Sequence, residues 1–534
     1  MVDSHEAQTN PIAPVLVGEH WRKSAGDGSF AKRSPETDAL LGEYPISPWS
    51  EVDEALGHAA AAYDEMAAAG PAVIADFVER FADRLEARSG ELVKVANAES
   101  ALPAIPRLQD VELPRTTGQL RAAAAAARDR TWKQSTISPR HAIASYLAPV
   151  PGVVAVFGPN NFPFAFNSVS GGDAAAAIAS GHPILAKANP GHPETTRLLA
   201  VEAREAAIDV GLPPTVVQLI YRTTHADGKR LVADPRTAAT AYTGSRTGGL
   251  ALKEAADRAG KPIYLEMSSI NPVVVLPGAL RQRGSEIAEE LAVSALTGVG
   301  QFCTSPGLLV LPFGEDGDSF IDVLSSRYTE SPGGVLLDST VRARLEVAQR
   351  TWQESGAQIV AAAVAPPGPC RFPTTVMKVD AGTFLQDPLA LQTEAFGNMI
   401  LIVQVPDTDG YVQILRALEG NLTGSIYSDD SDDERAYEAV VHELRPRVGR
   451  LLDDKVPTGV AVVPAMNHGG PYPSTGHPGF TAVGLPASMH RFGMLQCFDA
   501  VRPHRLPMEL QPENPLDIQR FVDGVWTSEQ TPWN

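Results

Sequence analysis

Cysteine is scarce in this 534-residue chain, which contains three, at positions 303, 370 and 497. Their spacing excludes a Cys-x-x-Cys pair and the usual zinc-ligand patterns. A chain of this length buries enough surface to fold without disulfide bonds. We therefore expect free thiols and a reducing, cytoplasmic location.

Metal-ligand patterns are missing as well. The twelve histidines include no His-Glu-x-x-His segment and no paired spacing typical of a metal site. We interpret His468, His477 and His490 as loop or surface residues rather than ligands, and we expect no metal.

Positive charge is in deficit, because 44 Lys and Arg residues face 63 Asp and Glu residues, giving a formal net charge of −19. Nucleic-acid-binding proteins normally carry a basic excess, so we expect no nucleic-acid partner. No apolar run is long enough to span a membrane as a helix, and the N-terminus lacks the apolar core of a signal peptide. We therefore expect no membrane partner.

Short apolar segments alternate with helical ones along the middle of the chain, as expected for an α/β fold. Glu194–Val210 is one of the expected helices, and a second alternating region between residues 308 and 464 contains the strand Met399–Val405. Such alternation predicts parallel sheets covered by helices on both faces, in two domains. The strands expected in the first domain are Val153–Phe157, Pro183–Ala188, Val216–Tyr221, Ala238–Thr243 and Ile263–Met267.

Cys303 and Glu266 are the candidate reactive side chains. Cys303 lies in the glycine-containing segment Thr297-Gly-Val-Gly-Gln-Phe-Cys303, where an open turn would suit a nucleophile. A buried structural thiol is the alternative. Glu266 ends an apolar strand, where desolvation would raise its pKa toward that of a general base. A carboxylate turned to solvent or to a salt bridge explains the position equally well.

Three further features stand at the carboxyl ends of expected strands, where open α/β sheets bind ligands. The amide of Asn161 could donate to an oxyanion, although an Asx turn is an alternative. The loop Gly244–Gly249 opens a helix and could bind phosphate, or it could simply cap that helix. Lys187 could contact a ribose or a phosphate, or it could be solvated.

Taken together and in order, these features resemble the aldehyde dehydrogenase superfamily over nearly the whole chain. The oxyanion-binding Asn of that family falls on Asn161, the general base on Glu266 and the nucleophile on Cys303. The motif Glu394-Ala-Phe-Gly397 implies that Glu394 holds the nicotinamide ribose and that Phe396 packs against the ring.

The resemblance also implies a nicotinamide dinucleotide as cofactor. Its strand-end Lys falls on Lys187, and its pyrophosphate motif falls on Thr243–Gly249, with Gly244, Ser245 and Gly249 as contacts. NAD-preferring relatives carry a Glu that repels the 2′-phosphate, and Pro190 stands at that position here. We therefore expect NADP or NAD, and we favour NADP.

The implied architecture is aldehyde dehydrogenase-like, with two α/β domains and a small arm that joins subunits into a homodimer or homotetramer. We expect a C-terminal surface extension over residues 503–534. The other expected units are a Rossmann-type cofactor-binding domain (residues 1–136 and 151–284), a catalytic domain (285–488) and an oligomerisation arm (137–150 and 489–502).

Several short segments narrow the resemblance to the 2,5-dioxovalerate (α-ketoglutarate semialdehyde) dehydrogenase branch. The implied reaction is oxidation of a small aldehyde, 2,5-dioxopentanoate, to 2-oxoglutarate through a cysteine thioester. Phe162, Phe166 and Phe302 could line the substrate pocket, although core packing explains Phe162 and Phe166 equally well. An NADP-dependent fatty (long-chain) aldehyde dehydrogenase is the alternative function. The branch segments are Glu99-Ser-Ala-Leu-Pro103, Arg115-Thr-Thr-Gly-Gln-Leu-Arg121, Gln301-Phe-Cys303 and His468-Gly-Gly-Pro-Tyr-Pro473.

Overall fold

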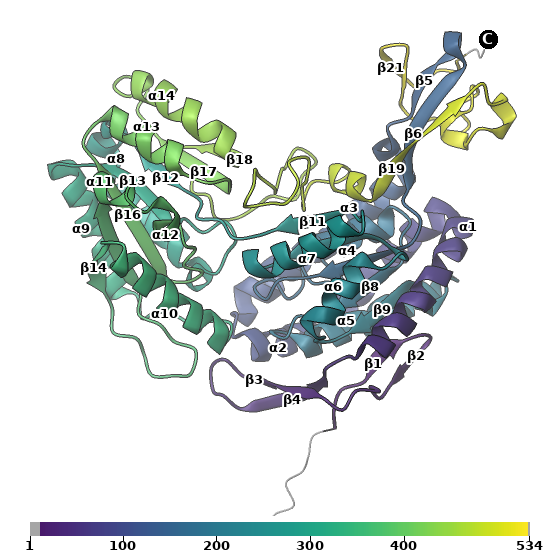
Figure 1. The fold of residues 1–534 in the computed structure, drawn as a ribbon, viewed down its shortest axis with the longest axis horizontal. Coiled ribbons are helices and arrows are strands. Elements are labelled where there is room, and N and C mark those ends of the chain that lie inside the picture. Colours follow the sequence, from purple (N-terminus) through teal and green to yellow (C-terminus); the bar gives the residue numbers. More distant parts are fainter. Residues whose placement is uncertain (1–10, 532–534) are drawn as a thin grey trace, which may run out of the picture.

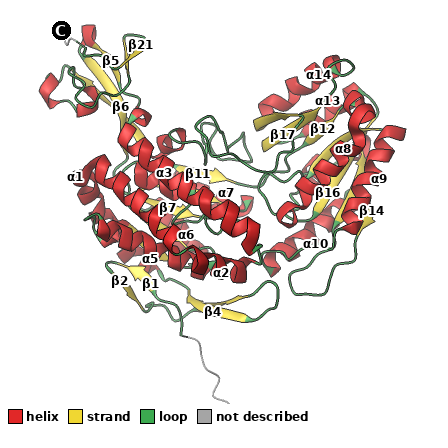
Figure 2. Ribbon diagram, turned by 180° about the vertical axis from the view of Figure 1, so that it is seen from behind, coloured by secondary structure: helices red, strands yellow, loops and turns green. Residues whose placement is uncertain are grey.

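A computed structural model describes residues 11–531 and places two large sheets side by side, with a smaller sheet projecting from one of them (Figure 1). Helices cover both large sheets, as Figure 2 shows from behind. Within the described residues, no helix combines the length and apolar character needed to cross a membrane.

The first large sheet contains the five strands expected from the sequence. Its central strands are parallel, and β7 is buried at every residue. The strand order is β11 (Ile263–Glu266), β10 (Thr237–Thr243), β7 (Val153–Phe157), β8 (Ile184–Lys187), β9 (Val217–Ile220), β1 (Val15–Val17) and β2 (His20–Arg22).

The helices of this unit divide between the two faces of the sheet. Right-handed crossovers place the helices after β7 and β8 on one face, and those after β9 and β10 on the other. The first group packs against α1, and the second group packs together. The helices are α1 (Trp49–Ala87), α2 (Ser89–Ser100), α3 (Leu113–Asp129), α4 (Gly172–Ala179), α5 (Pro193–Asp209), α6 (His225–Ala233) and α7 (Arg246–Arg258).

The sequence predicts two helices between Ser50 and Arg88, the first of them capped by Ser50, and the structure differs from this prediction in detail. The structure has one segment, Trp49–Ala87, which kinks at Gly70, where φ is 81°. Pro71 follows the kink and cannot donate to the helical ladder. The cap prediction is wrong, because Pro48 stands at the N-cap and no side chain caps this end.

The second large sheet is mostly parallel and carries its own helices. The strand order is β14 (Gln358–Ala362), β15 (Thr375–Asp380), β16 (Met399–Val405), β13 (Leu308–Pro312), β12 (Val273–Val275), β17 (Asn421–Tyr427) and β18 (Val448–Asp453). The helices are α8 (Pro277–Leu296), α9 (Glu315–Glu330), α10 (Ser339–Glu354), α11 (Ala381–Phe384), α12 (Pro388–Leu391), α13 (Thr408–Ala417) and α14 (Glu434–Leu444).

The chain enters this second sheet earlier than the sequence-based boundary at residue 284. Strand β12 already pairs with β13 and β17 of the second sheet. The sequence predicts an amphipathic helix from Ser285 to Leu296, but helix α8 begins eight residues earlier, at Pro277, and is irregular at Arg283. A proline suits the first turn of a helix, so the helix extends back to that residue.

The projecting arm is a small sheet to which residues 520–527 contribute two strands. Residues 503–534 were expected as a surface extension, but β20 pairs with β5, inside the arm sheet. The strand order is β19 (Gly493–Asp499), β6 (Ile143–Pro149), β5 (Thr136–Ser138), β20 (Arg520–Val522) and β21 (Val525–Thr527), and a separate hairpin consists of β3 (Ser29–Arg33) and β4 (Leu40–Pro45).

Parallel register brings the candidate loops to one edge of the first sheet. Phe157 pairs with Lys187, and Thr243 pairs with Glu266. The loops that follow β7 and β10 therefore open on the same side as Glu266, as the strand-end argument predicts.

Candidate active site

A cavity of about 720 Å³ lies between the two large sheets. Both units contribute to its wall, so neither unit contains the site alone. From the first unit come Asn161, Gly244, Ser245 and Glu266, and from the second come Cys303, Glu394 and Phe396. Seven of the residues singled out in the sequence thus meet around one space. Lys187, Gly249 and the three phenylalanines lie outside this wall.

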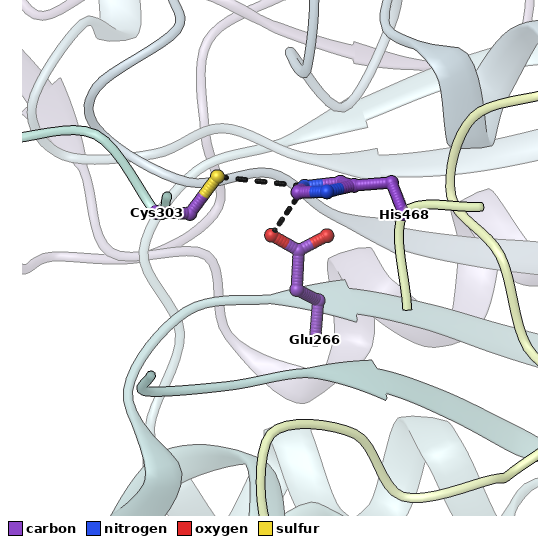
Figure 3. A group of neighbouring side chains, drawn as sticks. All are labelled: Glu266, Cys303 and His468. Atoms are coloured by element: carbon purple, nitrogen blue, oxygen red, sulfur yellow. Dashed lines mark hydrogen bonds and ion pairs between the residues drawn. The ribbon is translucent and has the colours of Figure 1, made fainter. Parts of the chain in front are cut away.

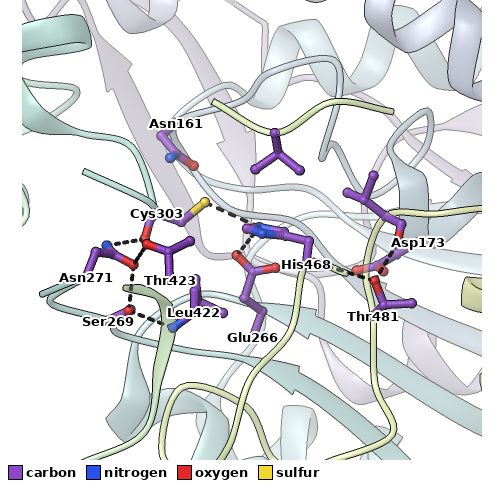
Figure 4. A network of polar contacts seen from close by, with 12 residues as sticks. Asn161, Asp173, Glu266, Ser269, Asn271, Cys303, Leu422, Thr423, His468 and Thr481 are labelled. Carbon is purple, nitrogen blue, oxygen red and sulfur yellow. Dashed lines mark hydrogen bonds and ion pairs between the residues drawn. The ribbon is translucent and has the colours of Figure 1, made fainter. Parts of the chain in front are cut away.

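Cys303 sits on a tight turn after α8. Residues 298–300 all have φ between 60° and 70°, which a glycine adopts freely. A Cβ atom on Gly300 would lie 2.1 Å from the carbonyl oxygen of Gly397, so only glycine fits there. Asn271 Nδ2 donates to the Cys303 carbonyl oxygen over 2.9 Å. These contacts fix the backbone beneath the sulfur, as Figure 4 shows.

Cys303, Glu266 and His468 form a compact group (Figure 3). The Nε2 atom of His468 lies 3.4 Å from the Cys303 sulfur and 3.0 Å from Oε1 of Glu266. The side chains of Glu266 and His468 are each only 2% exposed. Oε2 of Glu266 has no hydrogen-bond partner among residues 11–531, which leaves it available to a water or a substrate.

The prediction that His468 is a loop or surface residue is wrong about its burial. The residue does lie in a loop, but this loop pairs with the edge strand β11 through an isolated antiparallel bridge between Glu266 and Thr475. Met267 N donates to the Ser474 carbonyl oxygen over 2.8 Å, and His468 N donates to Thr481 Oγ1 over 2.9 Å. The motif that begins at His468 was visible in the sequence, but its path into the site depends on tertiary contacts.

Electrostatics keep the Cys303 sulfur protonated in the resting site. Burial raises the pKa of the Cys303 thiol, and the neighbouring Glu266 carboxylate raises it further. A base must therefore accept the proton before the sulfur can act as a nucleophile. The His468 imidazole is placed to accept it, since Nε2 already contacts the sulfur.

Asn161 lies beside the Cys303 sulfur in Figure 4. Its Nδ2 donates to the Gln301 carbonyl oxygen over 2.8 Å, which orients the amide along the nucleophile turn. The loop that carries it is held by Glu112, whose Oε1 accepts from the backbone N–H groups of Phe164 and Ala165 over 2.8 and 3.0 Å.

The glycine loop after β10 forms the start of α7 and faces the cavity. Ser245 Oγ accepts from Gly248 N over 3.3 Å and caps the helix, while Gly244 N donates to the Glu266 carbonyl oxygen over 3.1 Å. A Cβ atom on Gly249 would come within 3.0 Å of the Met267 sulfur. The free end of the helix thus points at the cavity, as a phosphate group would require.

Glu394 and Phe396, from the second unit, line the same cavity. Oε1 of Glu394 accepts from Ser269 N over 3.3 Å. Burial raises the pKa of the Glu394 carboxyl group. Its contact to a nucleotide ribose stays a prediction.

Lys187 lies away from the cavity wall, at the end of β8. Burial lowers the pKa of Lys187 to about 8, and the positive charge of Arg222 acts in the same direction. A desolvated ammonium beside a second cation would be stabilised by an anionic ligand.

The three phenylalanines form one aromatic cluster on the other side of Cys303. The ring of Phe162 lies 5.2 Å from that of Phe166 and 5.3 Å from that of Phe302, centre to centre. The Phe166 ring lies 5.8 Å from the His468 ring. The cluster is largely buried and packs beside the active-site histidine, so a role in lining a substrate pocket stays a prediction.

The ligand atoms of Glu266, Cys303 and His468 all lie within 4.8 Å of one another. Oxygen, sulfur and nitrogen donors of these types also bind zinc. The sequence could not reveal the grouping, since His468 stands 165 residues from Cys303 and 202 from Glu266. That the protein works without a metal stays a prediction.

The comparisons with known sequences agree on one family. A model described as the aldehyde dehydrogenase family matches residues 21–470. The chain is 38% identical over 495 residues to alpha-ketoglutaric semialdehyde dehydrogenase 2 of Azospirillum brasilense, which covers 90% of this chain and 93% of that protein. It is 36% identical over 465 residues to alpha-ketoglutaric semialdehyde dehydrogenase of Acinetobacter baylyi, covering 85% and 87%.

Solved structures confirm the predicted α/β fold. Aldehyde dehydrogenase C of Pseudomonas syringae, crystallised with NAD+ and octanal, matches with a TM-score of 0.77 at 19% identity, over 95% of this chain and 99% of that chain. Lactaldehyde dehydrogenase of Escherichia coli matches with a TM-score of 0.78 at 20% identity, over 91% and 98%. The chain therefore belongs to the aldehyde dehydrogenase family, whose members are NAD(P)-dependent oxidoreductases that act on aldehydes.

Proposed function

We propose that this oxidoreductase converts 2,5-dioxopentanoate to 2-oxoglutarate, with Cys303 as nucleophile and Glu266 as general base. The grouping of sulfur, imidazole and carboxylate carries the proposal, because the sulfur and the carboxylate line one cavity and the imidazole contacts both, which supplies a nucleophile and a base. The identity of the substrate is supported by the two relatives named as alpha-ketoglutaric semialdehyde dehydrogenases.

In the first step, the Cys303 thiol gives its proton to His468, and the sulfur attacks the aldehyde carbon. The aldehyde oxygen becomes an alkoxide, which the Asn161 amide and the Cys303 backbone N–H stabilise. A bound nicotinamide dinucleotide supplies the acceptor for the hydride that leaves this carbon. The carbon remains attached to Cys303 as a thioester.

In the second step, water cleaves the thioester. The unpartnered Oε2 of Glu266 accepts a proton from the water, whose oxygen attacks the carbonyl carbon. The carbon–sulfur bond breaks, the product leaves as a carboxylic acid, and the sulfur recovers a proton from the His468–Glu266 pair. The same pair thus serves both steps at different times.

Gly244 and Ser245 would hold the pyrophosphate of the cofactor and Glu394 its nicotinamide ribose, and we favour NADP over NAD. Pro190 provides no negative charge against a 2′-phosphate, and Lys187 and Arg222 provide two positive charges nearby. The two positive charges attract a 2′-phosphate and no carboxylate at position 190 repels it, so both effects favour NADP.

The arm sheet supports a homo-oligomer. Its edge strand β19 leaves main-chain groups unpaired on one side, and such an edge can pair with a second copy. We propose a homodimer or homotetramer assembled through this arm.

An aldehyde screen tests the proposal. Purified protein is given 2,5-dioxopentanoate, pentanal and decanal with saturating NADP or NAD, and reduced cofactor is followed by absorbance. We expect the highest kcat/KM for 2,5-dioxopentanoate, with free acid formed without coenzyme A. A clearly higher value for decanal would favour a fatty aldehyde dehydrogenase instead, and a requirement for coenzyme A would exclude hydrolysis by Glu266.

A further inference from the structure

Arg115, on α3, has an unusual pattern of hydrogen bonds. Its Nη1 donates to the Val460 carbonyl oxygen over 2.8 Å, whereas its Nε and Nη2 are buried and have no partner among residues 11–531. These two nitrogens form one edge of the guanidinium plane, the edge that grips a carboxylate with two parallel hydrogen bonds. A buried donor without a partner is costly, so an acceptor is expected there.

The position of this guanidinium is set by the aromatic cluster. Its central carbon lies 5.3 Å from the centre of the Phe166 ring and 5.9 Å from that of Phe162. The Phe166 ring also packs against His468, which contacts the Cys303 sulfur. Arg115 therefore lies across the aromatic cluster from the nucleophile.

The length of the proposed substrate suits this arrangement. In 2,5-dioxopentanoate the aldehyde carbon and the carboxylate carbon are about 5 Å apart in an extended chain. A molecule of this length that presents its aldehyde to Cys303 extends its carboxylate past the Phe166 ring. The charge environment agrees. Burial lowers the pKa of Arg115, as expected for a buried cation whose charge is incompletely balanced by neighbouring anions.

Two other arginines near the site already have partners. Arg107 forms an ion pair with the buried Glu112 and donates to the Asn161 carbonyl oxygen over 3.2 Å. Arg450 donates from its two terminal nitrogens to the carbonyl oxygens of Gly459 and Pro457 over 2.9 and 2.6 Å. Arg115 alone among these three leaves a complete guanidinium edge unpaired.

We propose that Arg115 binds the carboxylate of the aldehyde substrate through Nε and Nη2 and thereby selects carboxylated aldehydes. This inference rests on the proposed function, since it assumes an acidic substrate. A protein of net charge −19 needs a local cation to bind an anionic substrate, and the proposal assigns this role to Arg115.

The test compares Arg115→Met and Arg115→Lys with the unmodified protein on two aldehydes of equal chain length. One is 2,5-dioxopentanoate and the other is the uncharged pentanal. We expect Arg115→Met to lower kcat/KM for the acid by at least about 100-fold, and to change the value for pentanal less than about threefold. Arg115→Lys should recover part of the loss, because it restores charge without the two-pronged contact.

Arg121→Met is the matched control, because Arg121 lies on the same helix and pairs with the surface residues Glu86 and Asp83. It should behave like the unmodified protein on both aldehydes. Retained turnover of pentanal shows that a variant is folded. If Arg115→Met also loses pentanal turnover, the inhibition of NADP reduction by glutarate is measured in Arg115→Lys and in the unmodified protein. An inhibition constant that is the same in both would overturn the proposal.

The failure of this inference and that of the proposed function differ in outcome. An unmodified protein that does not prefer the acid over pentanal would contradict the proposed function. A preference that survives in Arg115→Met, or that disappears in Arg450→Gln instead, would contradict only the assignment to Arg115.

Discussion

His468 couples the nucleophile to the general base through a single nitrogen atom. Nε2 lies within hydrogen-bond reach of the Cys303 sulfur and of Glu266, but it can hold only one proton at a time. Deprotonation of the thiol and activation of water must therefore follow one another. Because burial and Glu266 raise the pKa of Cys303, removal of the His468 imidazole should slow chiefly the step in which the thiol loses its proton.

His468→Gln should lower kcat/KM by about 100-fold near neutral pH, since glutamine keeps a donor for Glu266 but accepts no proton from the thiol. The loss should shrink as the pH rises, because solvent then deprotonates the thiol directly. The measurements are a kcat/KM–pH profile and the rate of Cys303 alkylation by iodoacetamide. An alkylation rate equal to that of the unmodified protein across the pH range would exclude a proton-accepting role.

Glu266→Gln should allow one round of hydride transfer and then stall at the thioester, because the base for water is lost. Rapid mixing with NADP and aldehyde should give a burst of reduced cofactor followed by slow turnover. Cys303→Ala is the control and should give no burst, while Cys370→Ala and Cys497→Ala should remain active. Unchanged steady-state turnover in Glu266→Gln would remove this residue from the mechanism.

Single residues were predictable from the sequence where their local motif carried the signal. Cys303, Glu266 and Asn161 stand in characteristic segments, and the structure brings all three to one cavity. His468 stands in an equally recognisable segment, yet glycine- and proline-rich loops are normally exposed. Tertiary contacts, such as that between Met267 and Ser474, show that this loop instead pairs with the edge of β11.

At the scale of elements, Lys187 at the end of β8 carries the positive charge that we propose selects the cofactor. The pKa of Lys187 is lowered to about 8, so its side chain is positive below that pH and neutral above it. If Lys187 holds the 2′-phosphate, KM for NADP should rise as the pH passes from about 7.5 to 9. KM for NAD should change much less over the same range. A parallel rise for both cofactors would contradict the assignment.

Helix α5, which follows β8, is held at its start by the buried Glu99. The carboxylate accepts from Glu194 N and Thr195 N over 2.9 Å each and from Thr195 Oγ1 over 2.7 Å. Glu99→Ala should lower the free energy of unfolding by about 3 kcal/mol, because three buried donors lose their acceptor. Thermal unfolding checks this, with Glu91→Ala on the same helix α2 as a surface control.

The pH dependence of this stability has a definite sign. Burial raises the pKa of Glu99 from its usual value of 4.5 to about 7. Between these two values the folded protein binds more protons than the unfolded chain, so the contribution of Glu99 to stability falls as the pH rises through this range. Glu99→Gln should not show this fall, and an identical pH dependence in the variant would show that Glu99 does not titrate there.

The elements themselves were largely predictable, because buried parallel strands are short apolar runs and helices separate them. Strand β16 has the bounds expected from the sequence, and β7 does as well. The start of α8 and the sheet membership of β12 were not predictable, since three apolar residues do not reveal which sheet they join.

For the whole molecule, the arm predicts assembly. Leu495 on β19 is 75% exposed, although it is large and apolar. Leu495→Asp should shift the protein to a smaller species in size-exclusion chromatography with light scattering, because a charge in an apolar contact is disfavoured. Leu40→Asp, on the distant hairpin strand β4, is the control and should leave the mass unchanged. A mass that stays the same in Leu495→Asp would place the contact elsewhere.

The residues of the reactive group come from two structural units. Glu266 ends the first sheet, whereas Cys303 and His468 belong to the second unit and its returning loop, so their distances exist only while the two units stay in place. A mild denaturant or a mutation at the junction of the two units would abolish turnover while both sheets keep their secondary structure. Turnover therefore reports on the fit between the two halves sooner than circular dichroism or fluorescence would.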